Sequence, residues 1–183
     1  MELQEAIDNR RSVRRYAEYY VTDDELKKIL EAARQAPSWS NTQVWEFIVV
    51  RDKDLIEKVV STYSEKNPAT RGSLNASVLV VACARTDKSG CYNDKQMTKF
   101  SSWFMFDLGL AVQNLCLKAH EMNLGTVIVG LMDHDACKNV LSVPDGYEVV
   151  AVIPLGQPAA AKPGPGRKEL KEFVHLNTFG NPF

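Results

Sequence analysis

Several common sequence signals are missing from this chain of 183 residues. Only four cysteines occur, and none has the Cys-x-x-Cys or Cys/His spacing of a zinc site. We therefore expect free thiols in a reducing compartment, which favours a cytoplasmic protein. The three histidines are far apart in sequence and predict no local metal site. The N-terminus lacks the basic and apolar regions of a secretion signal.

Charge of one sign and long apolar runs are also absent. The 22 basic and 23 acidic residues nearly cancel to a net charge of -1, which argues against nucleic acid as a partner. The most apolar stretch, residues 103–119, is interrupted by Asp107 and Lys118 among other polar residues, so it predicts no membrane span. Neither the Rossmann nor the P-loop glycine pattern occurs, so a bound nucleotide must be held by other groups.

What is present is typical of one globular domain over residues 1–183, with 45% hydrophobic and 25% charged residues. The apolar run at residues 77–84 indicates a strand that is buried on both faces, hence a sheet with helices on both sides. Thr22 and Glu25 form a capping box that begins a helix. The pattern predicts helices at residues 2–10, 23–35, 53–63, 103–119 and 133–141, strands at 45–50, 77–84 and 147–155, and a loop or extended arm at 156–166.

The stretch at residues 103–119 is expected to be a helix that is apolar nearly all round. Such a helix must be covered on two sides, either by its own sheet and helices or by another copy of the chain. We therefore expect it to lie at the core of a homodimer.

Two segments carry candidate chemistry. The first has four arginines within residues 10–15, and guanidinium groups suit phosphate oxygens, although a solvated helix face would look similar. Arg167 and Lys168 near the other end of the chain could complete a phosphate cage, because chain ends often lie close together. The second is the polar run at residues 37–43, which fits ligand hydrogen bonding or an ordinary turn that closes a helix.

These segments carry a family resemblance. R-R-S-V-R-R-Y at residues 10–16, A-P-S-W-S-N-T-Q-V-W-E-F at 36–47, a hydrophobic Q-N-L helix and a closing G-R-K-E-L occur in this order. In this pattern the chain resembles the FMN-dependent nitroreductase family over essentially its whole length. The resemblance implies an α+β fold with a central, mostly antiparallel sheet flanked by helices. It also implies a homodimer with the long hydrophobic helix at the interface and each FMN between the subunits.

The resemblance further implies the residues of the flavin site. One subunit is expected to hold FMN through its N-terminal arginine segment, the partner through its polar loop, and the ring edge is expected to meet the backbone after the central helix. The implied cofactor-binding residues are Arg10, Arg11, Ser12, Arg14, Pro37, Ser38, Ser40, Asn41, Gln43, Ile128, Val129, Gly130, Arg167 and Lys168. Within this set, the resemblance implies that the Val129 and Gly130 backbone lies near the reactive ring and that one of its amides donates to the hydride-accepting nitrogen.

The sequence departs from the family pattern in places. Val44 replaces a common proline, Val129 stands where a Glu or Gly is frequent, and residues 64–71 align poorly, which leaves open whether Asn67 or Arg71 touches the flavin. The chain is also short for the family, so helices that cover the site in larger members are expected to be reduced.

The implied activity is that of an FMN-dependent oxidoreductase. It would take hydride from NADH or NADPH and pass electrons to a small acceptor, such as a nitroaromatic, a quinone or a flavin, by a ping-pong mechanism. No catalytic side chain and no metal are expected, because the flavin does the chemistry. Two alternatives stay open: a specialist relative such as a reductive dehalogenase, and a non-catalytic flavin-binding or sensing dimer. The sequence indicates neither the natural acceptor nor the preferred pyridine nucleotide.

Overall fold

The computed structural model describes residues 1–93, 95–160 and 164–183. Its helices are α1 (Leu3–Asn9), α2 (Asp23–Arg34), α3 (Lys53–Ser61), α4 (Thr70–Leu74), α5 (Phe104–Glu121) and α6 (His134–Val140), with 3-10 turns η1 (Trp39–Asn41) and η2 (Leu170–Glu172). Its strands are β1 (Trp45–Val50), β2 (Val78–Arg85), β3 (Cys91–Tyr92), β4 (Lys95–Gln96), β5 (Gly125–Thr126) and β6 (Tyr147–Gly156). The predicted helices and the three longer strands are confirmed, and the short α4 is an addition. Part of the predicted arm, residues 161–163, lies outside the described residues.

The main sheet has four strands in the order β1-β2-β6-β5, and every pair is antiparallel. Strand β2 lies in the middle, where its residues from Val78 to Ala84 are buried as the apolar run predicted. A register shift at Ala82 and Cys83 interrupts its pairing with β6. The expected antiparallel sheet is therefore confirmed.

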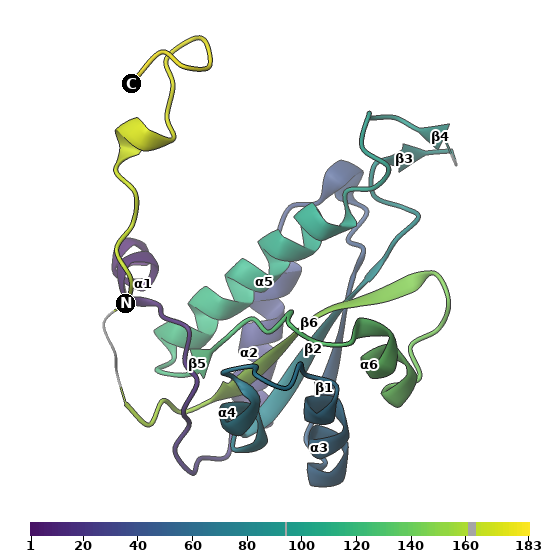
Figure 1. The fold of residues 1–183 in the computed structure, drawn as a ribbon, viewed down its shortest axis with the longest axis vertical. Coiled ribbons are helices and arrows are strands. Elements are labelled where there is room, and N and C mark those ends of the chain that lie inside the picture. The colour runs from purple at the N-terminus through teal and green to yellow at the C-terminus, as the bar shows by residue number, and fades with distance from the viewer. Residues whose placement is uncertain (94, 161–163) are drawn as a thin grey trace.

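Helices cover both faces of this sheet (Figure 1). On one face, Val80 and Ala82 of β2 pack with buried residues of α2 and α5. On the other face, Leu79 and Val81 pack with α3 and α6. Each fully buried valine or leucine contributes about 1.5–3 kcal/mol, so the burial of both faces makes β2 a large part of the core.

The helix α5 runs diagonally across the sheet and packs on α2 (Figure 1). Its inner residues are buried, but Met105 and Phe106 near its start are 58% and 59% exposed. In the described part of the chain, no helix has the length and apolar content needed to cross a bilayer.

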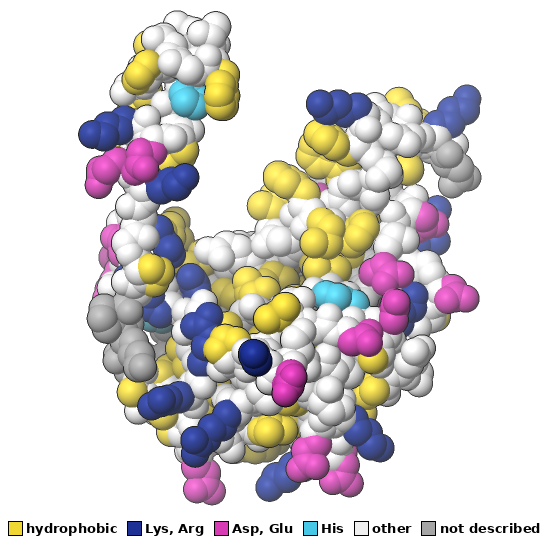
Figure 2. All heavy atoms as spheres, in the orientation of Figure 1, with side chains coloured by type: hydrophobic (Ala, Val, Ile, Leu, Met, Phe, Trp, Pro, Cys, Tyr) yellow, Lys and Arg dark blue, Asp and Glu magenta, His cyan; other side chains and the backbone are white. Residues whose placement is uncertain are grey.

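Large apolar side chains are also exposed beyond the sheet. The segment from Gly164 onward passes α1 and continues away from the sheet (Figure 1). Figure 2 shows hydrophobic side chains on this segment and on the opposite projection, which carries β3 and β4. The exposed residues of these two regions are Tyr92, Met97, Phe100, Met105, Phe106, Leu170, Phe173, Leu176, Phe179 and Phe183.

Candidate functional site

The arginine segment, residues 10–16, is an extended chain that follows α1 and lies along the end of the sheet. Ser12 forms a parallel bridge with Thr126 of β5, and the Val13 amide donates to the Thr126 carbonyl at 2.8 Å. Further on, the Ala159 amide donates to the Arg15 carbonyl at 3.0 Å. Because the backbone is held on two sides, the positions of the arginine side chains along the sheet are fixed.

Behind the segment, α4 packs against its main chain. Gly72 is buried, and a Cβ added there would lie 2.3 Å from the Arg14 carbonyl oxygen. The hydroxyl of buried Tyr16 donates toward the carbonyls of Val13 and Pro154 at 2.9 and 3.0 Å. Burial raises the pKa of Tyr16, so its hydroxyl stays protonated and holds the segment against the two carbonyls.

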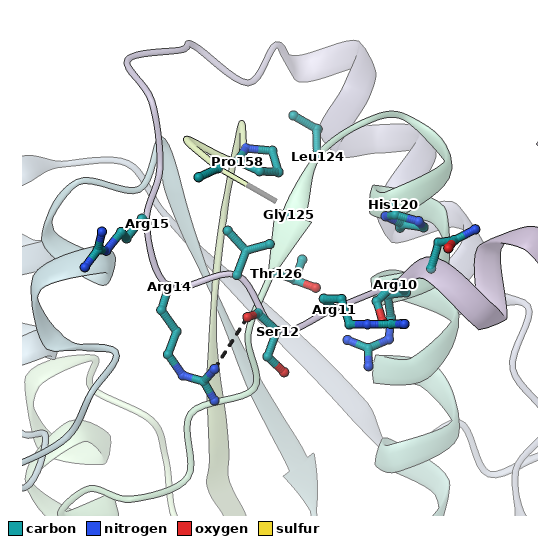
Figure 3. A pocket seen from close by; sticks show the side chains of 13 residues that line it. Arg10, Arg11, Ser12, Arg14, Arg15, His120, Leu124, Gly125, Thr126 and Pro158 are labelled. Carbon is teal, nitrogen blue, oxygen red and sulfur yellow. Dashed lines mark hydrogen bonds between the residues drawn. The ribbon is translucent and has the colours of Figure 1, made fainter. Parts of the chain in front are cut away.

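The segment lines a cavity of about 620 Å³ (Figure 3). Its other walls come from the last turn of α5, from β5 and from the chain after β6, represented by His120, Thr126 and Pro158. A second hollow of about 460 Å³ is lined by Arg14, Arg15 and Arg71, so Arg14 borders both. The structure thus brings together Arg10, Arg11 and Arg14, which were predicted to bind an anion. It places Arg15 and His120 at the same cavity and Arg71 at the second hollow.

No carboxylate neutralises this group of cations within the described residues: their ion pairs include none of the arginines at 10, 11, 14, 15 and 71. Burial, followed by the charges of Arg10 and Arg11, lowers the pKa of His120. The charge of the Glu5 carboxylate opposes this shift. Arg10 and Arg11 nevertheless place positive charge beside the cavity, and positive charge attracts anions.

The arginine side chains differ in how many contacts hold them in place. Arg11 donates from one nitrogen to the backbone carbonyls of Asp8 and Arg10, and Gly164 of the C-terminal segment lies against its side chain. Among the residues that the structure describes, the Arg14 side chain has one hydrogen bond, a long one of 3.4 Å to the Ser12 carbonyl (Figure 3). The structure therefore gives Arg11 a partly structural role and leaves Arg14 more available to a ligand.

Arg167 and Lys168 follow Gly164 in the C-terminal segment and are exposed. Neither lines the two cavities. The two ends of the chain lie close together as predicted, because Gly164 contacts the Arg11 side chain. The structure does not bring Arg167 or Lys168 into the arginine cavity.

The polar loop, residues 37–43, connects α2 to β1 in a constrained shape. Ser40, Asn41 and Gln43 all have positive φ angles of 46°, 56° and 47°. The Ser38 hydroxyl accepts from the Gln43 amide at 2.9 Å, and the Gln43 side chain donates to the Asn41 side chain at 3.1 Å. Pro37 follows the turn at the end of α2 and precedes η1. Costly backbone angles in an exposed loop are common at ligand sites.

This loop and the arginine cavity lie at opposite ends of α5. The Trp39 amide donates to Asp107 in the first turn of α5, whereas the cavity contains His120 from its last turn. At about 1.5 Å per residue, the distance along the helix from Asp107 to His120 is roughly 20 Å. A single chain therefore does not bring the two predicted halves of the site together.

The stretch at residues 128–130 follows β5. The Val129 amide donates to the Val152 carbonyl at 2.9 Å, and the Val129 carbonyl accepts from the Val152 amide. The Val129 amide is therefore already in use, which leaves the Gly130 amide as the other donor that the resemblance implies. Ile128 is 53% exposed and Gly130 is also exposed. The Gly130 carbonyl lies 3.1 Å from the His134 ring, whose other nitrogen is 3.0 Å from the Val149 carbonyl. Ile128 and Gly130 are therefore the exposed residues of this stretch, whereas Val129 is buried.

Asn67 has a structural role. Its side chain donates to the Leu131 carbonyl at 2.8 Å and accepts from the Ala69 amide at 2.9 Å. It therefore supports the turn after Gly130, whereas Arg71 faces the second hollow.

Comparison with known proteins gives a consistent result. Residues 7–157 match the model of the Nitroreductase family. A protein of Methanothermobacter thermautotrophicus, provisionally named NADH dehydrogenase/NAD(P)H nitroreductase, is 33% identical over 182 residues, which cover 96% of this chain and 87% of the relative. A protein of Archaeoglobus fulgidus with the same name is 31% identical over 183 residues, covering 96% and 91%.

Solved structures agree with the sequence comparison. A nitroreductase family protein from Clostridium novyi NT superposes with a TM-score of 0.77 at 29% identity and covers 100% of this chain and 97% of that one. An FMN-dependent nitroreductase from Clostridium difficile has a TM-score of 0.81 at 26% identity, covering 96% and 99%. The expected α+β fold is confirmed, and the family match spans most of the sequence. The chain belongs to the nitroreductase family.

Proposed function

We propose that this protein is an FMN-dependent oxidoreductase that takes electrons from NADH or NADPH and passes them to a small acceptor. Nitroaromatics, quinones and flavins are the acceptor classes we favour. Family membership and the names of the relatives support an NAD(P)H-linked redox enzyme. The observation that carries the proposal is the arginine cavity, whose cations have no carboxylate partner among the ion pairs of the described residues.

The residues present fit a flavin mononucleotide. Arg10 and Arg11 offer guanidinium groups to a phosphate dianion, and Ser12 offers a hydroxyl to the adjoining chain. FMN, when bound, supplies the centre that accepts two electrons from a pyridine nucleotide and passes them on. Arg14 places a fixed positive charge where negative charge develops during reduction, and this charge favours electron uptake.

We propose that the site is shared between two copies of the chain. The polar loop and the arginine cavity lie roughly 20 Å apart along α5. One chain therefore supplies its loop to one flavin site and its arginine cavity to the other. Two α5 helices packed with opposite directions place the loop of one copy beside the cavity of the other. The exposed Met105 and Phe106 at the start of α5 support burial of this surface against a partner.

The remaining chemistry is positioning. Ile128 and Leu131 are 53% and 59% exposed on the open turn after β5, and they offer an apolar surface on which flat substrates can stack. In the proposed ping-pong scheme, the pyridine nucleotide leaves before the acceptor enters the same slot. No acid or base side chain is required, because orientation lowers the barrier.

The test is anaerobic reduction of the purified protein that carries FMN. We expect NADH, NADPH or both to bleach the visible absorbance of the oxidised flavin in a rapid-mixing experiment, and we expect an acceptor added afterwards to restore it. Bound FMN that neither nucleotide bleaches would reject the enzyme in favour of a flavin-binding or sensing dimer. A protein that binds no FMN would reject the proposal as a whole.

A further inference from the structure

The buried carboxylate of Asp107 connects the polar loop to the core. Asp107 is 1% exposed in the first turn of α5. One carboxylate oxygen accepts from the Trp39 amide at 3.1 Å, and the other accepts from the Ser89 hydroxyl at 2.6 Å. Ser89 is itself fully buried.

The loop needs such an anchor. Three of its residues, Ser40, Asn41 and Gln43, hold positive φ angles without being glycine. These conformations persist only where the surroundings hold them. Among the described residues, the side-chain hydrogen bonds to residues 38–43 are local except for that of Asp107. Asp107 is therefore the side chain that fixes this exposed loop relative to the rest of the molecule.

We propose that Asp107 is a positioning residue that presents the polar loop to the flavin site of the partner subunit. This inference rests on the proposed function, because it assumes a flavin site shared between two copies. Asp107 is buried and bonded to the loop backbone, so it acts on a ligand only through residues 38–43. The arginine cavity of the same chain lies at the far end of α5. We therefore expect Asp107 to affect flavin binding at the arginine cavity of the partner subunit.

The first measurement is FMN affinity of apoprotein variants, followed by flavin fluorescence. Asp107→Leu replaces the carboxylate with a larger apolar side chain that accepts no hydrogen bond, so we expect FMN to bind at least about tenfold more weakly, as for one lost buried partner. Asp107→Asn keeps an oxygen for the Trp39 amide and can donate to Ser89, so we expect affinity within about threefold of the parent. Rescue by the amide supports positioning through geometry.

Ser89→Ala is the matched control. It removes the other hydrogen bond of the same carboxylate and leaves the bond to Trp39 in place. We expect this variant to lose thermal stability but keep its FMN affinity. If Asp107→Leu does not fold, Asp107→Ala replaces it. Equal loss of FMN in the Ser89 and Asp107 variants, or unchanged FMN affinity in the Asp107 variant despite lower stability, would overturn the proposal.

A mixed dimer tests the action between subunits. Differently tagged Asp107→Leu and Arg14→Ala chains are co-expressed, and the dimer carrying both tags is isolated. One of its two sites then combines an intact arginine segment with an intact loop, so we expect about half the FMN content of the unsubstituted dimer. The homodimer of either variant should retain little FMN. A mixed dimer no better than either homodimer would refute action across the interface. Absence of FMN from the parent dimer would instead refute the proposed function.

Discussion

Replacement of Gly72 by alanine should move the arginine segment without touching any arginine side chain. The new Cβ would lie 2.3 Å from the Arg14 carbonyl oxygen and 2.8 Å from its carbonyl carbon. Both atoms belong to the main chain, so no side-chain rotation can relieve the clash. Either α4 or the arginine segment must shift to restore ordinary contact distances.

The magnitude follows from the buried setting. Overpacking of this kind costs about 1–3 kcal/mol. For a chain of this size, each kcal/mol lowers Tm by about 2–4 °C, so a fall of roughly 2–12 °C is expected. Because Arg14 moves with its backbone, FMN should also bind more weakly. Thermal unfolding of the apoprotein and FMN titration measure the two effects separately.

Gly166→Ala is the glycine control. Its added Cβ meets no atom within 4 Å and its φ is ordinary, so we expect a change in stability below about 0.5 kcal/mol. If Gly72→Ala matched this control in both Tm and FMN affinity, the packing of α4 against the arginine segment would not support the site, and the reasoning would fail.

Three further predictions concern charge, assembly and pH. Arg14→Ala should weaken FMN binding and lower the flavin reduction potential; unchanged occupancy and potential would reject its role beside the ring. Phe106→Asp should split the proposed dimer and release flavin, as checked by light scattering and absorbance, and a monomer that keeps FMN would contradict a shared site. Burial raises the pKa values of Tyr63 and Cys83 to about 12, above their ordinary values of 10.0 and 9.0. The unfolded chain therefore releases these protons first, so stability should hold below pH 9 and fall between pH 9 and 12; a flat unfolding free energy across that range would contradict this.

Local elements could be predicted because their causes are local. The capping box at Thr22 and Glu25 forms both of its hydrogen bonds, and α2 begins where that pattern placed it. The apolar run of β2 predicted a strand covered on both faces, and helices lie on both. Hydrophobic periodicity does not indicate the relative direction of the strands. The antiparallel sheet was predicted from the family resemblance.

Other features depend on contacts between distant parts of the chain. The pattern marked Asp107 only as a polar interruption of an apolar helix, because its bond to Trp39 links residues 68 positions apart. The engagement of the Val129 amide depends on β6 pairing with the turn after β5. His120 lies just beyond the predicted helix at residues 103–119, and the structure places it on the last turn of α5. Its proximity to Arg10 and Arg11 depends on the fold.

The bridge between Ser12 and Thr126 has a consequence for self-association. Strand β5 ends the order β1-β2-β6-β5 and has only two residues, so its outer side is an edge that could pair with a foreign strand. The arginine segment covers that edge by pairing with Thr126, and its charges disfavour the addition of a foreign strand there. The arginines therefore oppose aggregation through this edge even when no anion is bound. Substitution of several of these arginines together should lower the solubility of the protein before it lowers the stability of the fold.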